Sequence, residues 1–325
     1  MGIFIIAFQS IRNLVIFYRK PFLIENFTYF KWFNMQLFFP SFFCGPINTY
    51  DYFLKQKGEE IRFNLDKFII GIKLFFWALL KKLVIVDRLQ WFMTSYAGSS
   101  FQIGGGWDVV LVIFIPFFYV TFLVGAYYSF GRSISFLLGF EPHRNVDIYA
   151  YLTGIGNFWS RWLVTLKQTF DEFFEDSKHC KLISYSLILL LNITIFCKSY
   201  LGLVFLPLFA ALIYLDFYIQ ERNYWNISLF SSTIKIFSYL LIALFWSILF
   251  SSGKIILNLT GEFNTLRSFN NSDFLIFIII LLVVILHIVR RKFSLVKMKR
   301  GDQLEDISLV GIAFLGYFVM MFGVF

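Results

Sequence analysis

The chain has 325 residues, of which 58% are hydrophobic, 22% aromatic and 15% charged, and its mean hydropathy is +0.71. A soluble domain carries about 25% charged residues because its surface faces water, so this composition excludes a soluble globular enzyme and indicates a membrane protein. The net charge of +9 fits membrane topology better than nucleic-acid binding, because zinc spacings, helix-turn-helix patterns and aromatic RNA-binding strands are missing.

Two apolar stretches in the first part of the chain are too interrupted to cross a bilayer as simple helices. Residues 33–47 contain two prolines and a glycine, and residues 68–86 contain three lysines. Irregular backbone at membrane depth is tolerated only where it is buried in protein or lines a wet cavity. We therefore expect re-entrant or tilted helices in both stretches.

Six later segments are expected to cross the membrane, because about 20 apolar residues span its hydrocarbon core. In chain order they are residues 107–128, 182–197, 200–219, 234–250, 274–289 and 307–325. Residues 131–181 are polar yet dense in aromatic side chains, which is typical of amphipathic helices at the interface. A basic cluster at residues 290–300 directly follows an apolar segment and is expected on the cytoplasmic side.

The predicted fold class is all-α, a polytopic integral membrane protein that forms a single domain over residues 1–325. There is no internal repeat and no disordered linker in the sequence. The three cysteines, Cys44, Cys180 and Cys197, have no paired spacing, so we interpret them as small hydrophobic residues rather than disulfides. No metal site is predicted.

Three motif stretches follow one another along the first half of the chain. The first comprises Gly2, Ile3, Phe4, Phe8, Gln9 and Ser10, with Phe38, Phe39, Pro40, Gly45, Pro46 and Ile47 after them. The second comprises Leu79, Leu80, Lys81, Lys82, Leu83, Val84, Ile85, Val86, Asp87 and Arg88. The third comprises Leu137, Leu138, Gly139, Phe140, Asn145, Asn157, Phe158, Trp159, Ser160, Arg161, Trp162, Thr165 and Leu166.

In their order and separation these stretches resemble the membrane-bound O-acyltransferase (MBOAT) family, in its branch of alginate O-acetylases and teichoic-acid D-alanine transfer proteins. The resemblance implies a bowl of membrane helices with re-entrant and interfacial helices, and a tunnel where an acyl group meets a hydroxyl acceptor. It also implies a multi-pass location in the bacterial cytoplasmic (inner) membrane. The lipid bilayer and periplasmic or extracellular polysaccharide-modifying proteins would be the partners.

The resemblance further implies an acyl donor such as acetyl-coenzyme A or an acyl carrier, and no bound cofactor. In the family an invariant histidine in the tunnel acts as general base on the acceptor hydroxyl, a role that suits a pKa near working pH. Residues that could line the tunnel are Trp159, Arg161, Trp162, Lys81 and Lys82. The two tryptophans and the arginine could equally anchor an interfacial helix.

The chain departs from the family at the positions that carry chemistry. Leu163 stands where the family has a histidine after the tryptophan. Residues 206–222, which correspond to the run with the second histidine, contain none, and Tyr214 lies nearest the expected place. Residues 123–129 lack the acidic groups of the family's stretch. We also expect the chain to be short at its N-terminus relative to the family.

Three residues are weak candidates for a relocated base: Asp216, Tyr214 and His287. Asp216 lies near the end of an apolar segment, where it could act as a base or pair with Arg222 or Lys198. His287 lies near the cytoplasmic end of an apolar helix, and an ionisable group there is a functional candidate. A neutral imidazole bonded to a neighbouring helix is the simpler interpretation of His287.

The other two histidines have simpler interpretations. His143 lies in a polar loop and is predicted to be solvated, and His179 lies beside Cys180 at the predicted interface.

Several functions remain open on this sequence. The first hypothesis is O-acylation, in particular O-acetylation, of an envelope polysaccharide. The second is a catalytically inactive relative that serves as a scaffold or partner of an active enzyme, because loss of a general base costs roughly 100-fold to 10,000-fold in rate. A truncated gene product and a transporter are further alternatives, although the paired broken helices expected of a transporter are missing.

Overall fold

The computed structural model describes residues 2–21, 27–42, 45–58, 63–97, 106–143, 145–146 and 162–174, with residues 240 and 243. This part of the chain is helical and holds no strand. In chain order its elements are α1 (Gly2–Arg19), α2 (Tyr29–Gln36), η2 (Phe39–Phe42), α3 (Tyr50–Gly58), α4 (Leu65–Leu80), η3 (Lys81–Val86), α5 (Asp87–Ala97), α6 (Gly106–Leu137) and α8 (Val164–Phe174). Apart from residues 240 and 243, the five predicted membrane segments after residue 181 lie outside the described residues, and the single domain over residues 1–325 stays a prediction.

Helix α4 begins with a side-chain cap. The Asn64 side-chain oxygen accepts hydrogen bonds from the backbone N–H groups of Asp66 and Lys67 at 2.9 and 3.1 Å. This satisfies N–H groups that have no partner within a helix's first turn. The loop before α4 therefore ends at a defined residue.

Residues 68–86 are helical throughout, with a π-helical turn at the two later lysines, and a re-entrant or tilted course through the membrane stays a prediction. Helix α4 passes into the π-helical turn η3 and then into α5. The side-chain amines of the two later lysines have partners. Lys81 Nζ donates to Ser129 Oγ at 2.9 Å, and Lys82 pairs with Asp87. The lysine amines bond to other side chains, so the backbone groups of this segment keep their hydrogen bonds within the helix.

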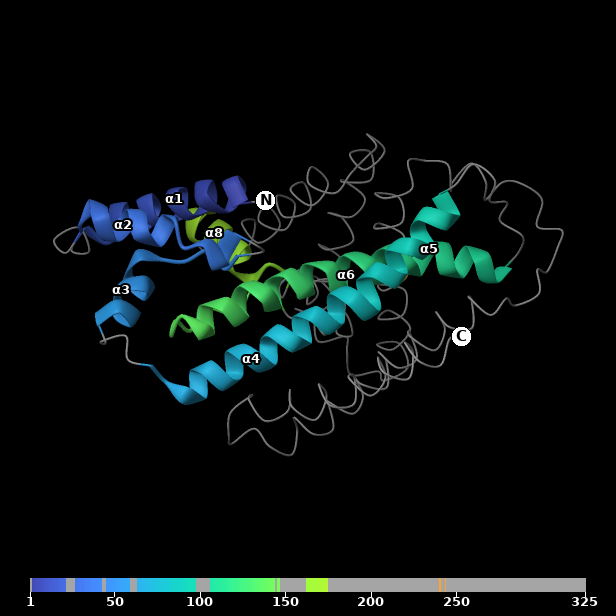
Figure 1. The fold of residues 1–325 in the computed structure, drawn as a ribbon. Helices are drawn as coiled ribbons and strands as arrows, with labels where there is room; N and C mark the ends of the chain where they lie inside the picture. The colour runs from blue at the N-terminus through green and yellow to red at the C-terminus, as the bar shows by residue number, and fades with distance from the viewer. Residues whose placement is uncertain are drawn as a thin grey trace, which may run out of the picture.

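Helices α4 and α6 run antiparallel as the longest packed pair in Figure 1. At one end a Cβ added to Gly71 would lie 2.9 Å from the Leu137 side chain and 3.1 Å from its backbone nitrogen. Ser133 Oγ donates to the Gly71 carbonyl at 2.7 Å beside this close approach. At the other end an apolar cluster, including Val86 and Ile115, joins η3, α5 and α6.

Helix α6 is longer than the sequence predicts. A helix covers the segment expected at residues 107–128 and continues to Leu137. Residues 131–137, where the sequence predicts the start of an interfacial region, belong to this same helix, and their place at the interface stays a prediction. Their small side chains, such as the buried Ser133, pack against α4, and this contact outweighs their polarity.

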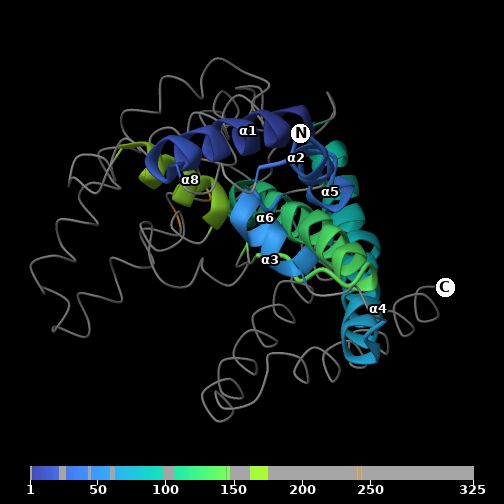
Figure 2. The ribbon, with the colours of Figure 1, turned by 90° about the vertical axis from the view of Figure 1, so that its left-hand side faces the viewer.

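The remaining elements gather where α6 ends, with α1 beside α8 in two perpendicular views (Figures 1 and 2). The predicted interruption within residues 33–47 is present: α2 ends at Gln36, η2 follows, and the Gly45–Pro46 peptide is cis. An aromatic cluster holds these segments together. Its buried members are Phe17, Met35, Tyr50 and Phe53.

Helix α1 has its polar face inside and its apolar face outside. Gln9 and Asn13 are fully buried, whereas Ile11, Leu14 and Tyr18 are 47%, 64% and 88% exposed. A helix on the surface of a soluble protein has the opposite arrangement. This distribution is the one expected of a helix whose outer face contacts lipid.

Helix α4 also presents an apolar outer face, formed by Leu65, Ile69, Ile72 and Phe76. Within the described residues one helical segment, Ile113–Leu137, is long and apolar enough to cross a membrane. Membrane association is therefore supported by one apolar helix and two outward apolar faces.

Candidate functional site

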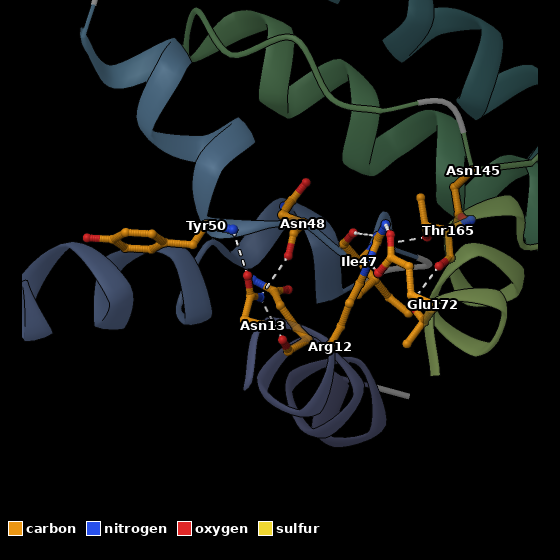
Figure 3. Close-up of polar contacts among 10 residues, drawn as sticks. Arg12, Asn13, Ile47, Asn48, Tyr50, Asn145, Thr165 and Glu172 are labelled. Carbon is orange, nitrogen blue, oxygen red and sulfur yellow. Dashed lines mark hydrogen bonds and ion pairs between the residues drawn. The ribbon is translucent and has the colours of Figure 1, made fainter. Parts of the chain in front are cut away.

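A buried arginine on α1 links two distant parts of the chain. Arg12, 5% exposed, donates from Nε and Nη2 to the two carboxylate oxygens of Glu172 on α8, at 2.8 and 2.7 Å. Its Nη1 donates to the Ile47 carbonyl at 3.0 Å. A bidentate arginine–carboxylate pair fixes orientation as well as charge. Arg12 thus holds α1, α8 and the chain after Pro46 in one geometry (Figure 3).

The neighbouring Asn13 repeats this pattern one residue along α1. Its Nδ2 donates to the carbonyls of Gln9 and Asn48 at 2.7 and 3.1 Å, and its Oδ1 accepts from the Tyr50 N–H at 2.7 Å. Two of these contacts, to the Asn48 carbonyl and to the Tyr50 N–H, reach backbone groups that have no partner within a helix. A buried backbone group without a partner is costly, so Asn13 stabilises the start of α3.

Asn145 and Thr165 form the other half of the network. Asn145 Oδ1 accepts from the Thr165 N–H at 2.9 Å and from Thr165 Oγ1 at 2.6 Å. Thr165 Oγ1 in turn accepts from the Ile47 N–H at 3.0 Å. Asn145 and Thr165 are 3% and 1% exposed. They therefore connect α8 to the same peptide segment that Arg12 holds from the other side, as Figure 3 shows.

Gly45 stands where this network approaches the backbone most closely. Its φ is +82°, and a Cβ added there would lie 2.5 Å from Asn145 Nδ2. A residue with a side chain would meet both an unfavourable φ and a clash. Glycine is required here for packing against Asn145.

Two motif stretches from the sequence are thus brought together. Gln9 and Ile47 belong to the first, and Asn145 and Thr165 belong to the third, and all four lie in or beside the network. We call the set Arg12, Asn13, Ile47, Asn145, Thr165 and Glu172 the polar junction. The polar junction can hold these backbone segments in fixed positions. Most of its side-chain hydrogen bonds join one member of the set to another.

His143 lies beside the polar junction and is half-buried, so the prediction that it is solvated is wrong. Its ring stacks on Tyr52, with centroids 3.5 Å apart and planes at 30°. Burial lowers the pKa of His143, and the positive charge of Arg12 lowers it further. Burial raises the pKa of Tyr52, and the nearby charge of Glu141 adds to this effect.

Leu163, which stands where the resemblance expects histidine, has an unusual backbone. Its φ is +53°, and its carbonyl accepts from Leu166 and Lys167 N–H at the start of α8. A left-handed conformation is unfavourable for leucine and better suited to glycine, asparagine or histidine. The side chain offers no proton transfer.

Three of the predicted tunnel residues lie within the described chain. Trp162 is 1% exposed and is enclosed by protein just before α8. Lys81 is 4% exposed, and its Nζ lies 5.0 Å from the centre of the Trp77 ring in addition to its bond to Ser129. Lys82 pairs with Asp87 on the surface of η3. Their place in a tunnel stays a prediction.

The other predicted site residues, Trp159, Arg161, Tyr214, Asp216 and His287, lie outside the described residues. Within the part of the chain that is described, no group of three His, Cys, Asp or Glu side chains could hold a metal ion.

Sequence reasoning missed Arg12, Asn13 and Glu172 as members of a site. The signal was present on α1, because Gln9, Arg12 and Asn13 are spaced i, i+3 and i+4 within an apolar helix. Polar residues at this spacing share one face, and such a face in an apolar helix must be buried against partners. The partner Glu172, 160 residues away, carried no comparable signal.

No protein-family model matches the chain. The chain is similar to a teichoic acid D-alanyltransferase from Bacillus subtilis (strain 168), with 25% identity over 177 residues. The aligned region is 53% of this chain and 44% of the relative. The chain therefore spans less than half the length of the relative. The match hints at the family that the motifs resemble.

Proposed function

We propose that this chain takes part in the transfer of an acyl or aminoacyl group to a polymer of the bacterial envelope. The observation that carries the proposal is the similarity over 177 residues to a teichoic acid D-alanyltransferase. The proposal includes membership of the MBOAT family and a multi-pass location in the cytoplasmic membrane. Its partners would be the bilayer and envelope proteins that modify polysaccharide.

The polar junction supports this proposal. Its hydrogen bonds join α1, the segment after Pro46 and α8, which carry two of the motif stretches that resemble the family. Motifs distant in sequence but bonded in space are expected of one functional region rather than of chance similarity.

The chemistry would be attack of an acceptor hydroxyl on the carbonyl of an activated acyl donor, such as acetyl-coenzyme A or an acyl carrier thioester. Acetyl and D-alanyl groups are both small acyl groups, so either could be delivered by the same reaction. Lys81, Lys82 and Trp162 are the candidates for the acyl path within the described residues.

The test is transfer of labelled acyl groups in bacterial membranes that contain the protein. Acetyl and D-alanyl thioesters are supplied separately, and label is measured in teichoic acid and in extracted polysaccharide. We expect incorporation above that of membranes without the protein. The variants Asp216→Ala, Tyr214→Phe and His287→Ala test the bases suggested by the sequence. Equal incorporation with and without the protein, for both donors, would contradict the proposal.

An inactive relative is the second candidate, and Leu163 favours it. An aliphatic side chain occupies a position where a base is expected, although the backbone there has the left-handed conformation that histidine tolerates better. Under this hypothesis the protein would bind an active transferase without transferring label itself. Co-purification of tagged protein with transfer activity, from membranes where the tagged chain alone is inactive, would support it.

A further inference from the structure

His143 is held in place by its own backbone and by its ring. Two residues before it, Glu141 N–H donates to Gln56 Oε1 at 2.8 Å, and Gln56 Nε2 donates back to the Glu141 carbonyl at 2.7 Å. The Tyr128 hydroxyl donates to the His143 carbonyl at 3.1 Å, and the ring stacks on Tyr52. Helices α3 and α6 therefore fix this imidazole in one position.

The Tyr128 hydroxyl also ties His143 to the polar junction. It accepts a hydrogen bond from the Asn145 N–H at 2.9 Å while it donates to the His143 carbonyl. Asn145 is bonded to Thr165, and Thr165 to Ile47. The imidazole thus lies at the edge of the region where two motif stretches meet.

The surroundings favour the neutral form of the ring. Among the described residues, Tyr52 from α3 stacks on the ring, Arg12 from α1 acts on it through its charge, and the Tyr128 hydroxyl from α6 bonds its backbone carbonyl. Glu141, two residues before it, acts on Tyr52. Burial and Arg12 lower the pKa of His143, and no hydrogen bond of either ring nitrogen is found within the part of the chain that the structure describes. A neutral, half-buried imidazole with available nitrogens has the properties of a general base.

We propose that His143 is the general base of the acyl transfer, in place of the histidines that the chain lacks. This inference rests on the proposed function. An imidazole nitrogen takes the proton of the acceptor hydroxyl while the hydroxyl oxygen bonds to the carbonyl carbon of the donor thioester. The carbon–sulfur bond then breaks, and the thiolate takes the proton back from the imidazolium. Thioester and alcohol become ester and thiol.

The decisive variant is His143→Phe, because phenylalanine keeps the stack on Tyr52 and removes both nitrogens. We expect the variant to unfold at nearly the wild-type temperature and its kcat to fall roughly 100-fold to 10,000-fold. The KM for the acceptor should change by less than about threefold, since the proposal assigns His143 no role in binding. Transfer is measured with labelled acetyl and D-alanyl thioesters in membranes of equal protein content.

Two further readouts separate a base from a packing residue. In the wild type, kcat against pH should rise along a limb whose midpoint lies below the usual histidine pKa, and this limb should be missing in His143→Phe. In His143→Ala, which leaves space beside Tyr52, added imidazole should restore part of the activity. A residue that only packs would show neither effect.

The outcomes distinguish this inference from the function on which it rests. If the wild type transfers label and His143→Phe transfers it equally well, His143 is not the base, while the proposed function stands. If the wild type transfers no label from either donor, the proposed function fails and the inference fails with it. If His143→Phe loses most of its activity but its residual kcat keeps the pH limb, and imidazole does not restore His143→Ala, the base role is likewise rejected.

Discussion

At the scale of single residues, Arg12 joins parts of the chain that are far apart in sequence. We expect Arg12→Met to lower the free energy of unfolding by roughly 1–3 kcal/mol, because it leaves the Ile47 carbonyl and Glu172 without their partner. Thermal unfolding in detergent measures the change. The matched control is Lys55→Met, which removes a mostly exposed pair with Asp51 and should cost about 1 kcal/mol or less. Equal losses would contradict the central role of Arg12.

His143 gives a prediction about pH. Because its pKa in the folded protein is lowered, the fold favours the neutral ring, and its contribution to stability is present above the unfolded pKa of about 6.5. That contribution is lost as the pH falls through the lowered folded pKa. The unfolding temperature of the wild type should therefore fall more steeply below pH 6.5 than that of His143→Phe. Parallel curves would show that His143 does not titrate as the structure indicates.

At the scale of elements, Thr165 connects α8 to the segment after Pro46 through one hydroxyl. Valine has the same shape but leaves the Ile47 N–H without an acceptor, so we expect Thr165→Val to cost roughly 1–3 kcal/mol. Thr165→Ser keeps the hydroxyl and loses one methyl group, at a cost of about 1 kcal/mol. The unfolding temperatures should rank wild type, serine, valine. A serine variant less stable than the valine variant would show that the methyl matters more than the bond.

The packing of α4 on α6 depends on Gly71. Because an added Cβ would lie 2.9 Å from the Leu137 side chain, Gly71→Ala forces the two helices apart and should cost roughly 1–3 kcal/mol. Ile72→Ala, at a neighbouring position whose side chain is 38% exposed, is the control and should cost less. Denaturation of both variants in the same detergent checks the order.

At the scale of the whole molecule, the outward apolar faces of α1 and α4 predict contact with lipid. In a chain whose three natural cysteines are replaced by alanine, Leu14→Cys and Phe76→Cys should react slowly with a water-soluble maleimide in membranes and fast after denaturation, because a thiol in hydrocarbon does not ionise to the reactive thiolate. Lys55→Cys should react fast with the same reagent in membranes, since its side chain is exposed on the polar helix α3. Rapid reaction of Leu14→Cys with the water-soluble reagent would show that water, not lipid, covers α1.

The sequence by itself determined the helical character of the described residues and part of their layout. Composition indicated a membrane environment, the prolines in residues 33–47 predicted the break after α2, and the apolar run from residue 107 predicted α6. These features depend on local chemistry, namely hydropathy, backbone restriction and periodicity, which a sequence displays directly.

Only the tertiary structure decided which polar residues matter and where helices continue. The lysines at 81 and 82 lie in a π-helical turn of a continuous helix, where Ser129 and Asp87 bind their amines. His143 is stacked on Tyr52 rather than solvated, and Arg12 is paired with Glu172. Each result depends on a partner 5 to 160 residues away. A polar residue's role is decided by the partner that satisfies it, and a single sequence does not state which distant residues meet in space.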